Sequence, residues 1–154
     1  MARPFSLQTV LELMQSRSDE ATQRLARLIA AERDAQNKLL MLQQYRDEYS
    51  IRFRQAAQDG LGQPEWRNYQ EFMNRLDQAI EQQRQSVLVQ QGCTAAGQTA
   101  WQQQRTRLKA FDALADRHRA SEVRSELRQE QKAQDEFATR AKDQPRWQEM
   151  FRDI

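Results

Sequence analysis

The chain has 154 residues, of which 38% are apolar and 30% are charged. A globular domain of this size usually contains roughly 45–50% apolar residues, and only four glycines and three prolines interrupt the chain. Low apolar content with few helix breakers predicts long helices that are exposed over most of their circumference. The net charge of +2 comes from 24 basic and 22 acidic residues and gives little attraction to nucleic acids or anionic lipids.

The cysteine content and the hydropathy indicate the cellular compartment. The single Cys93 excludes an internal disulfide, and a thiol-sparse chain is typical of a reducing compartment. The mean hydropathy is −1.01, and no apolar run approaches the roughly 18 residues of a membrane span. The first residues, MARPFSLQTVLELMQ, lack the apolar core and cleavage site of a signal peptide. We expect a soluble, cytoplasmic protein without membrane insertion.

The first predicted helix covers residues 5–58. Pro4 and Ser6 are suitable residues for its start. From there, apolar residues recur at steps of three or four, the spacing of a coiled-coil seam, with one additional step of four after Ala21. Glu32 and Arg46 occupy seam positions, where a charged residue weakens the seam and can fix its register.

A dense cluster of turn residues, DGLGQP at residues 59–64, separates this helix from the next. Gly60 can supply a left-handed helix end, and Pro64 fits the first turn of a following helix. Two long amphipathic helices joined by so short a connection are expected to pack as an antiparallel hairpin.

The second predicted helix covers residues 65–143 and opens with two overlapping apolar stripes. The first stripe is a coiled-coil seam formed by Trp66, Tyr69, Met73, Leu76, Ile80 and Gln83. The second stripe consists of Phe72, Leu76, Ala79 and Gln83. A two-helix pair needs only one seam, so the second stripe is either a wider core or a docking face. We expect the first stripe to close the hairpin, with Phe72 and Ala79 on the outer edge and Leu76 shared.

An antiparallel hairpin closed near Gly62 places Phe53 near Tyr69, Leu42 near Ile80, and Leu25 near Trp101. The two glycines of the segment 92–97 predict a soft place or a kink in the second helix. The amino terminus is expected beside residues 115–120, which leaves residues 120–143 without a partner in their own chain. Because an isolated helix of this length is marginal in water, this overhang predicts a binding partner.

The overhang carries segregated charges and ends at a proline. Glu122, Glu126 and Glu130 form one row, and Arg124, Arg128 and Lys132 form another. Such rows suit a partner of mixed charge, although a solvated surface helix explains them equally well. Pro145 is expected to end the helix, which leaves residues 144–154 as a tail. Residues 1–154 are predicted to form a single coiled-coil hairpin.

The sequence does not predict an enzyme. It contains no GxxxxGK[ST] or GxGxxG phosphate-binding loop, and one cysteine with one histidine cannot build a zinc site without carboxylates. His118 lies between two arginines without a nucleophile beside it, and Cys93 has no histidine nearby in the sequence. We therefore expect no catalytic residue, no cofactor and no metal. Acidic residues interrupt the basic residues of the segment 105–119, so we expect no nucleic-acid partner.

Four blocks of the sequence resemble the FliJ family of the flagellar type III export apparatus. The blocks are MLQQYRDEY at 41–49, WRNYQEFMNRLDQAIEQQR at 66–84, RLKAFDALADRH at 107–118 with Trp101 before it, and EQKAQDEFATRA at 130–141. The resemblance covers nearly the whole chain. It implies an all-α, antiparallel two-helix coiled coil similar to the coiled coil of the rotary ATPase γ stalk, with the second helix longer.

The resemblance also implies a role in flagellar biogenesis and motility, without an enzymatic activity. The implied partners are the export ATPase FliI at its hexamer centre, the export gate FlhA and the export chaperones. The implied location is cytoplasmic, peripherally associated with the inner membrane through the export apparatus. The gate-binding residues would be those of the second stripe, Phe72, Leu76, Ala79 and Gln83. The ATPase-binding residues would be Phe5, Leu7, Val10, Met14, Glu122, Arg124, Arg128, Gln131, Lys132, Asp135, Glu136 and Phe137.

One alternative function stays open at this point. If the second stripe pairs two hairpins with each other, the protein is a structural homodimeric coiled-coil scaffold. A stable dimer that forms without any export protein distinguishes this alternative from the export role.

Overall fold

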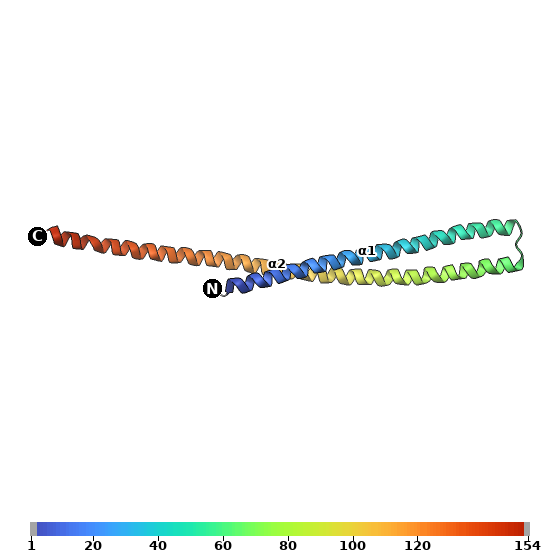
Figure 1. Ribbon diagram of the computed structural model, residues 1–154, viewed down its shortest axis with the longest axis horizontal. Coiled ribbons are helices and arrows are strands. Elements are labelled where there is room, and N and C mark those ends of the chain that lie inside the picture. Colours follow the sequence, from blue (N-terminus) through green and yellow to red (C-terminus); the bar gives the residue numbers. More distant parts are fainter. Residues whose placement is uncertain (1–2, 153–154) are drawn as a thin grey trace. The chain divides into compact units, whose positions relative to one another are not determined.

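The fold is an antiparallel hairpin of two long helices, as predicted (Figure 1). The computed structural model describes the backbone of residues 3–152 and the side chains of residues 7–142. Helix α1 spans Arg3–Gln58 and helix α2 spans Gln63–Arg152, and the described residues contain no strand. The chain divides into two compact units. Unit 2 consists of residues 15–106, and unit 1 consists of residues 1–14 together with residues 107–154.

The connection between the helices lies in unit 2 and follows the prediction closely. Gly60 has a φ of 93°, in the left-handed region, which an L side chain rarely adopts and glycine adopts readily. Pro64 falls within the first turn of α2, where its missing N–H donor is not needed. The amide of Trp66 donates to the carbonyl oxygen of Gly62 at 3.1 Å and so closes this first turn. The loop is therefore residues 59–62, two residues shorter than predicted.

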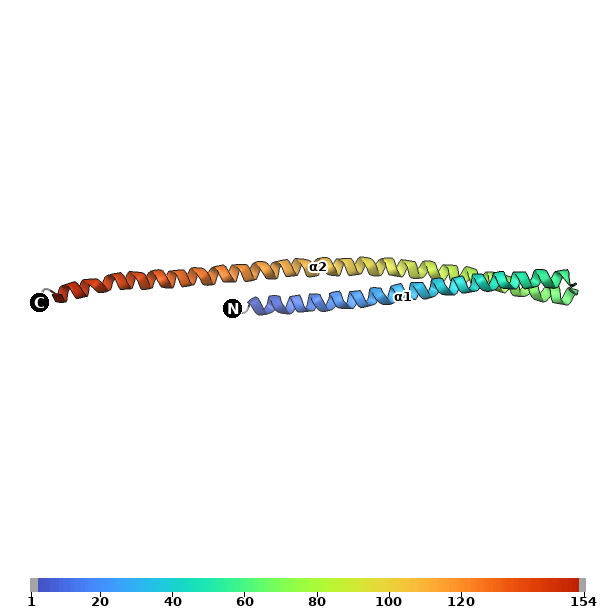
Figure 2. The same ribbon diagram turned by 90° about the horizontal axis from the view of Figure 1, so that it is seen from above.

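The core of unit 2 is one narrow seam between the two helices, which run side by side in both views (Figures 1 and 2). Its most buried apolar side chains are Leu76, Ile80 and Val87. No described side chain is less than 2% exposed, because each helix is covered on one side only. This narrow core explains why an apolar content of 38% is enough for the fold.

Contacts between the helices fix the register of unit 2. The rings of Phe53 and Tyr69 lie 5.2 Å apart between centroids, as expected. The predicted pairing of Leu25 with Trp101 is wrong by about one helical turn. Trp101 instead donates from Nε1 to Oγ1 of Thr22 at 3.0 Å, and Leu25 lies opposite Gly97. The register that pairs Phe53 with Tyr69 already places Leu25 opposite residue 97, because 28 residues separate each member of the first pair from the matching member of the second.

The two glycines of α2 have different surroundings, and neither interrupts the helix. A Cβ atom added at Gly97 would lie 2.5 Å from Cδ1 of Leu28, whereas one added at Gly92 would meet nothing within 4 Å. Gly97 therefore allows α1 to approach α2 closely, and this is a packing role. The sequence of α2 alone does not indicate this role, because the role depends on Leu28 of the other helix.

Alanine substitutions at these two glycines are expected to differ in their effect on the free energy of unfolding. Gly92→Ala should raise the free energy of unfolding by about 0.5–1 kcal/mol, since alanine is the better helix former. Gly97→Ala has the same gain in propensity, but the end of the Leu28 side chain must move to make room, which offsets part or all of that gain. Thermal and urea unfolding followed by circular dichroism should rank Gly92→Ala above Gly97→Ala. Equal stability of the two variants would show that the Leu28 side chain moves without cost.

Unit 1 pairs the beginning of α1 with a more distant part of α2, and the two lie side by side in both views (Figures 1 and 2). Ala115 is only 5% exposed, which indicates that this seam is closely packed. The beginning of α1 thus packs against this part of α2, as expected, while residues 1 and 2 lie outside the described residues. Beyond this seam, every described residue from 119 to 142 is exposed.

Helix α2 ends later than the sequence predicted. It continues through Pro145 to Arg152, so the expected helix end at 143 and the expected tail from 144 are wrong for the backbone. Proline removes one intrahelical hydrogen bond, at a cost of about 3 kcal/mol. Strong helix formers, among them glutamine, glutamate, arginine and methionine, follow Pro145 and favour the continued helix. The description of residues 1–154 as one domain stays a prediction.

Candidate partner-binding surfaces

The second stripe of α2 is mostly part of the hairpin core. Leu76 is 8% exposed and Gln83 is 9% exposed, while Phe72 and Ala79 are half-buried. Two of the four residues are therefore hardly accessible to a partner while the hairpin is closed. For Leu76 and Gln83, the structure selects the wider core over the docking face.

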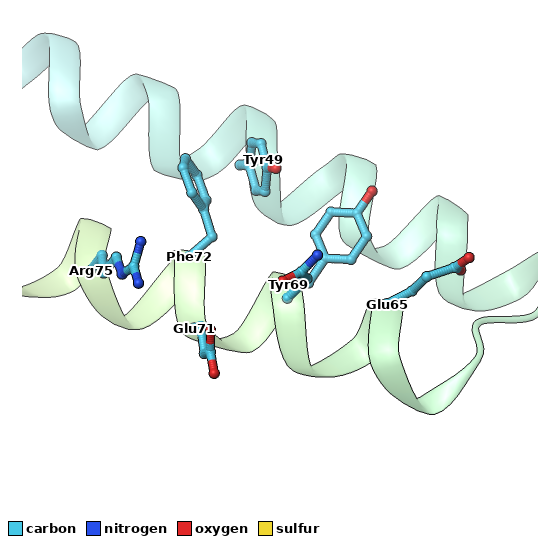
Figure 3. A pocket seen from close by; sticks show the side chains of 7 residues that line it. Tyr49, Glu65, Tyr69, Glu71, Phe72 and Arg75 are labelled. Atoms are coloured by element: carbon cyan, nitrogen blue, oxygen red, sulfur yellow. The ribbon is translucent and has the colours of Figure 1, made fainter.

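Phe72 does not form a free outer edge, which corrects the expected division between the two stripes. Its ring lies 4.1 Å from the ring of Tyr49 and 6.3 Å from that of Tyr45, measured between centroids. Figure 3 shows Phe72 extending from α2 toward α1 and reaching Tyr49, with Glu71 directed away from α1. Trp66, assigned to the seam, is 43% exposed instead. Trp66 nevertheless keeps one side in the seam, where its ring lies 5.0 Å from the ring of Phe53 between centroids.

Six aromatic side chains form a continuous cluster beside the loop of unit 2, and we call them the aromatic cluster. Neighbouring rings are tilted or edge-on, with centroids 4.1–6.3 Å apart, the range favoured by aromatic pairs. Its members are Tyr45, Tyr49, Phe53, Trp66, Tyr69 and Phe72. Tyr45 and Tyr49 of α1 were not among the predicted binding residues, although their positions opposite Phe72 follow from the hairpin register.

An open groove of about 410 Å³ runs along one side of the aromatic cluster (Figure 3). Apolar rings form part of it, and charged side chains border it. The lining residues are Tyr49, Glu65, Asn68, Tyr69, Glu71, Phe72 and Arg75. A partner that covers this groove could contact the exposed edge of Phe72 without opening the hairpin.

Polar contacts across the seam explain why Gln83 is buried. Its Nε2 donates to the carbonyl oxygen of Ala35 at 2.9 Å, between residues 48 apart in the sequence. A buried amide without such an acceptor would lose about 1–3 kcal/mol. Gln83 thus satisfies its own polar group and links the two helices at one register. The structure gives this residue a packing role, and its role in gate binding stays a prediction.

Arg46, a charged residue at a predicted seam position, also links the helices. Its Nε donates a hydrogen bond to Oδ1 of Asp77. This hydrogen bond, together with the negative charge of Asp77, raises the pKa of the Arg46 guanidinium. The two side chains are 40% and 50% exposed, so the pair adds little to stability and serves mainly to favour one register.

The first part of the predicted ATPase-binding surface lies in the seam of unit 1. Leu7, Val10 and Met14 are half-buried, as expected for side chains that face α2. Phe5 lies outside the residues whose side chains the structure describes. The half-buried residues have a packing role, and only their outer edges remain available to a partner.

The second part of that surface is a helix without a neighbour, residues 119–142 of α2, which we call the tail helix. It lies within unit 1, and all its described side chains are exposed. Its large apolar residues are Val123, Leu127 and Phe137, which are 55%, 58% and 75% exposed. The structure therefore confirms the predicted overhang, and brings no other described segment against the predicted tail residues Glu122, Arg124, Arg128, Gln131, Lys132, Asp135, Glu136 and Phe137.

The described residues offer no site for metal chemistry. Between residues 7 and 142, no three side chains of histidine, cysteine, aspartate or glutamate come together in a way that could hold a metal ion. His118 is half-buried, with Nε2 3.2 Å from Oε1 of Glu122, and Cys93 is an exposed free thiol. The same part of the chain contains no helix apolar enough over a sufficient length to cross a membrane.

Comparison with known proteins identifies the family to which this hairpin belongs. Residues 3–146 match the family model described as flagellar FliJ protein. The flagellar FliJ protein of Salmonella typhi is 32% identical over 141 residues, which cover 92% of this chain and 96% of the relative. The flagellar FliJ protein of Escherichia coli (strain K12) is 30% identical with the same coverage. Because the family model and both relatives match nearly the whole chain, the chain belongs to the flagellar FliJ protein family.

Proposed function

We propose that the protein is a non-enzymatic component of the flagellar type III export apparatus. In this proposal it binds the export ATPase FliI, promotes its hexamerisation and activation, connects it to the export gate FlhA, and escorts export chaperones. It acts in the cytoplasm, at the periphery of the inner membrane, through its contacts with the apparatus. Membership of the FliJ family supports this assignment.

The single observation that carries the ATPase part is the tail helix. A helix of about 24 residues gains most of its stability from packing, yet every described side chain from 119 to 142 is exposed. Three exposed apolar residues, with one acidic row and one basic row, give it a surface that a protein partner can cover. The half-buried residues Leu7, Val10 and Met14 extend this surface at their outer edges.

The gate part of the proposal rests on a smaller surface than the sequence suggested. Leu76 and Gln83 are buried in the hairpin, so direct contact falls to Phe72 and Ala79, which are half-buried. The groove beside Phe72 and the exposed Tyr45 enlarge the available area. The same burial weakens the structural homodimer built on the second stripe, because only two of its four residues can reach another hairpin.

An ATPase assay with the purified export ATPase tests the proposal. Adding this protein should raise the rate of ATP hydrolysis and the fraction of hexamer, and the protein alone should hydrolyse no ATP. Sedimentation of the mixture measures the oligomeric state in parallel. If neither the rate nor the oligomeric state of the ATPase changes at saturating protein, the ATPase part of the proposal is wrong.

A further inference from the structure

The tail helix has a stripe that continues at coiled-coil spacing over three heptads. Val123, Leu127, Phe137 and Ala141 fall on one face, at the a and d positions of a heptad. Glu130 and Gln134 occupy the two remaining seam positions of the same face. All these side chains are exposed within the part of the chain that the structure describes.

An antiparallel arrangement of two copies matches this face to itself. When the two tail helices are centred on Lys132, Leu127 of each copy lies level with Phe137 of the other. In the same alignment Val123 lies level with Ala141, and Glu130 lies level with Gln134. The pairing gives four apolar layers around two polar layers, and in each polar layer the Gln134 amide can donate to the Glu130 carboxylate.

The charges beside the seam favour this alignment. In an antiparallel pair the g positions of the two helices flank the same side of the seam, which places Glu126 of each copy beside Arg140 of the other. Both residues are exposed, and neither forms an ion pair with another described residue. Two symmetric Glu–Arg pairs result, without a like-charge contact along the seam.

A parallel arrangement lacks these features. It places Glu130 beside Glu130 of the second copy, and Arg119 beside Arg124. Both contacts bring like charges together, which is unfavourable. The charge pattern therefore favours the antiparallel orientation, and it favours a second copy of the tail helix as the partner that covers this face.

We propose that the tail helix of one molecule pairs antiparallel with the tail helix of a second copy through Val123, Leu127, Phe137 and Ala141, with Glu126 beside Arg140 on both sides. The contact is isologous, as in most dimers. Its four apolar layers make it a weak association, which keeps the apolar stripe covered in concentrated protein and releases it on dilution. It needs no export protein, and it covers Phe137 of the surface proposed for the ATPase, so one tail helix makes either contact but not both. It differs from the structural homodimer considered for the second stripe, because it uses the tail helix and dissociates on dilution.

Sedimentation velocity of the full chain tests this dimer in the absence of any ATPase. Between about 10 and 500 µM, the range of weak association, the mass should rise from that of the 18.2 kDa chain toward twice that value. Glu126→Arg should weaken the dimer at least about tenfold, because it places arginine beside arginine at both symmetric positions. The double variant with Glu126→Arg and Arg140→Glu should restore association.

The charge exchange is the decisive control. Restoration by the second substitution requires contact between positions 126 and 140 of different copies, whereas a general effect of net charge predicts no restoration. Circular dichroism should show the same helicity for all three proteins, since both residues are exposed. A chain that remains monomeric at every concentration, or a double variant that stays as weak as Glu126→Arg, overturns the proposal.

Disulfide trapping distinguishes the two orientations. In a Cys93→Ser background, Val123→Cys and Ala141→Cys are prepared as separate proteins and mixed under mild oxidation. Antiparallel pairing yields a disulfide only between the two different variants, because position 123 faces position 141. Disulfides that form within each variant alone indicate parallel pairing and contradict the proposed alignment.

Discussion

Replacing Leu76 by alanine is expected to lower the free energy of unfolding by about 2–4 kcal/mol, the usual range for a buried leucine. Leu76 is 8% exposed in the seam of unit 2, so its truncation leaves a cavity that the two packed helices fill only in part. For a chain of this length, the midpoint of thermal unfolding should fall by roughly 5–15 °C. Thermal and urea unfolding followed by circular dichroism at 222 nm measure both quantities.

Leu88→Ala is the matched control for this variant. It makes the same substitution in the same helix and the same unit, but Leu88 is 59% exposed. Its effect should stay within about 0.5 kcal/mol, as is usual for surface positions. If the two variants are equally stable, Leu76 is not a core residue and the second stripe is a docking face after all.

This result also determines how gate binding should be measured. A combined Phe72→Ala and Leu76→Ala variant would lose affinity for a partner partly because its hairpin is less stable. A substitution that leaves the seam in place is needed instead, such as Ala79→Gln, which adds bulk at a half-buried position and keeps a good helix former. The affinity of this variant for the gate protein can then be compared with that of the unsubstituted protein, after circular dichroism has shown that the two have the same helicity.

The sequence was sufficient for the features that depend on one helix or on its ends. The apolar spacing of three and four residues predicted two long helices, and Gly60 and Pro64 marked the turn between them with their own backbone preferences. The overhang after residue 119 followed from the two helix lengths alone. These predictions rest on the spacing of apolar residues and on the backbone preferences of single residues, which can be read from the sequence of one helix or turn.

Features that depend on both helices together were less predictable. The roles of Gly97 and of Gln83 became visible only when Leu28 and Ala35 were placed opposite them. Phe72 packs against Tyr49 more closely, and Trp66 is more exposed, than the sequence suggested, because a stripe of side chains does not show how far around it the partner helix extends. Pro145 was read as a helix end, although its cost of about 3 kcal/mol can be offset by a favourable helical context on either side.

The second large effect is expected for Arg124→Glu combined with Arg128→Glu in the tail helix. If the tail helix binds the export ATPase, this double variant should bind about 10- to 100-fold more weakly, because reversal of two interfacial charges replaces attraction by repulsion. Its own unfolding should change by less than about 0.5 kcal/mol, since both arginines are exposed. Titration of the ATPase with each variant, followed by the rate of ATP hydrolysis, measures the shift.

Arg27→Glu combined with Arg33→Glu provides the matched control, because both residues are exposed in unit 2 and the change in net charge is the same. Long-range electrostatic effects on association depend on the overall charge distribution and should be similar in the two double variants. A loss of activation confined to positions 124 and 128 therefore locates the contact on the tail helix. Equal losses in both double variants would instead indicate general charge repulsion, and retained activation in both would place the ATPase contact elsewhere.

Neither arginine lies at the Glu126–Arg140 contact proposed for the dimer, so a failure of ATPase binding and a failure of tail pairing can be told apart.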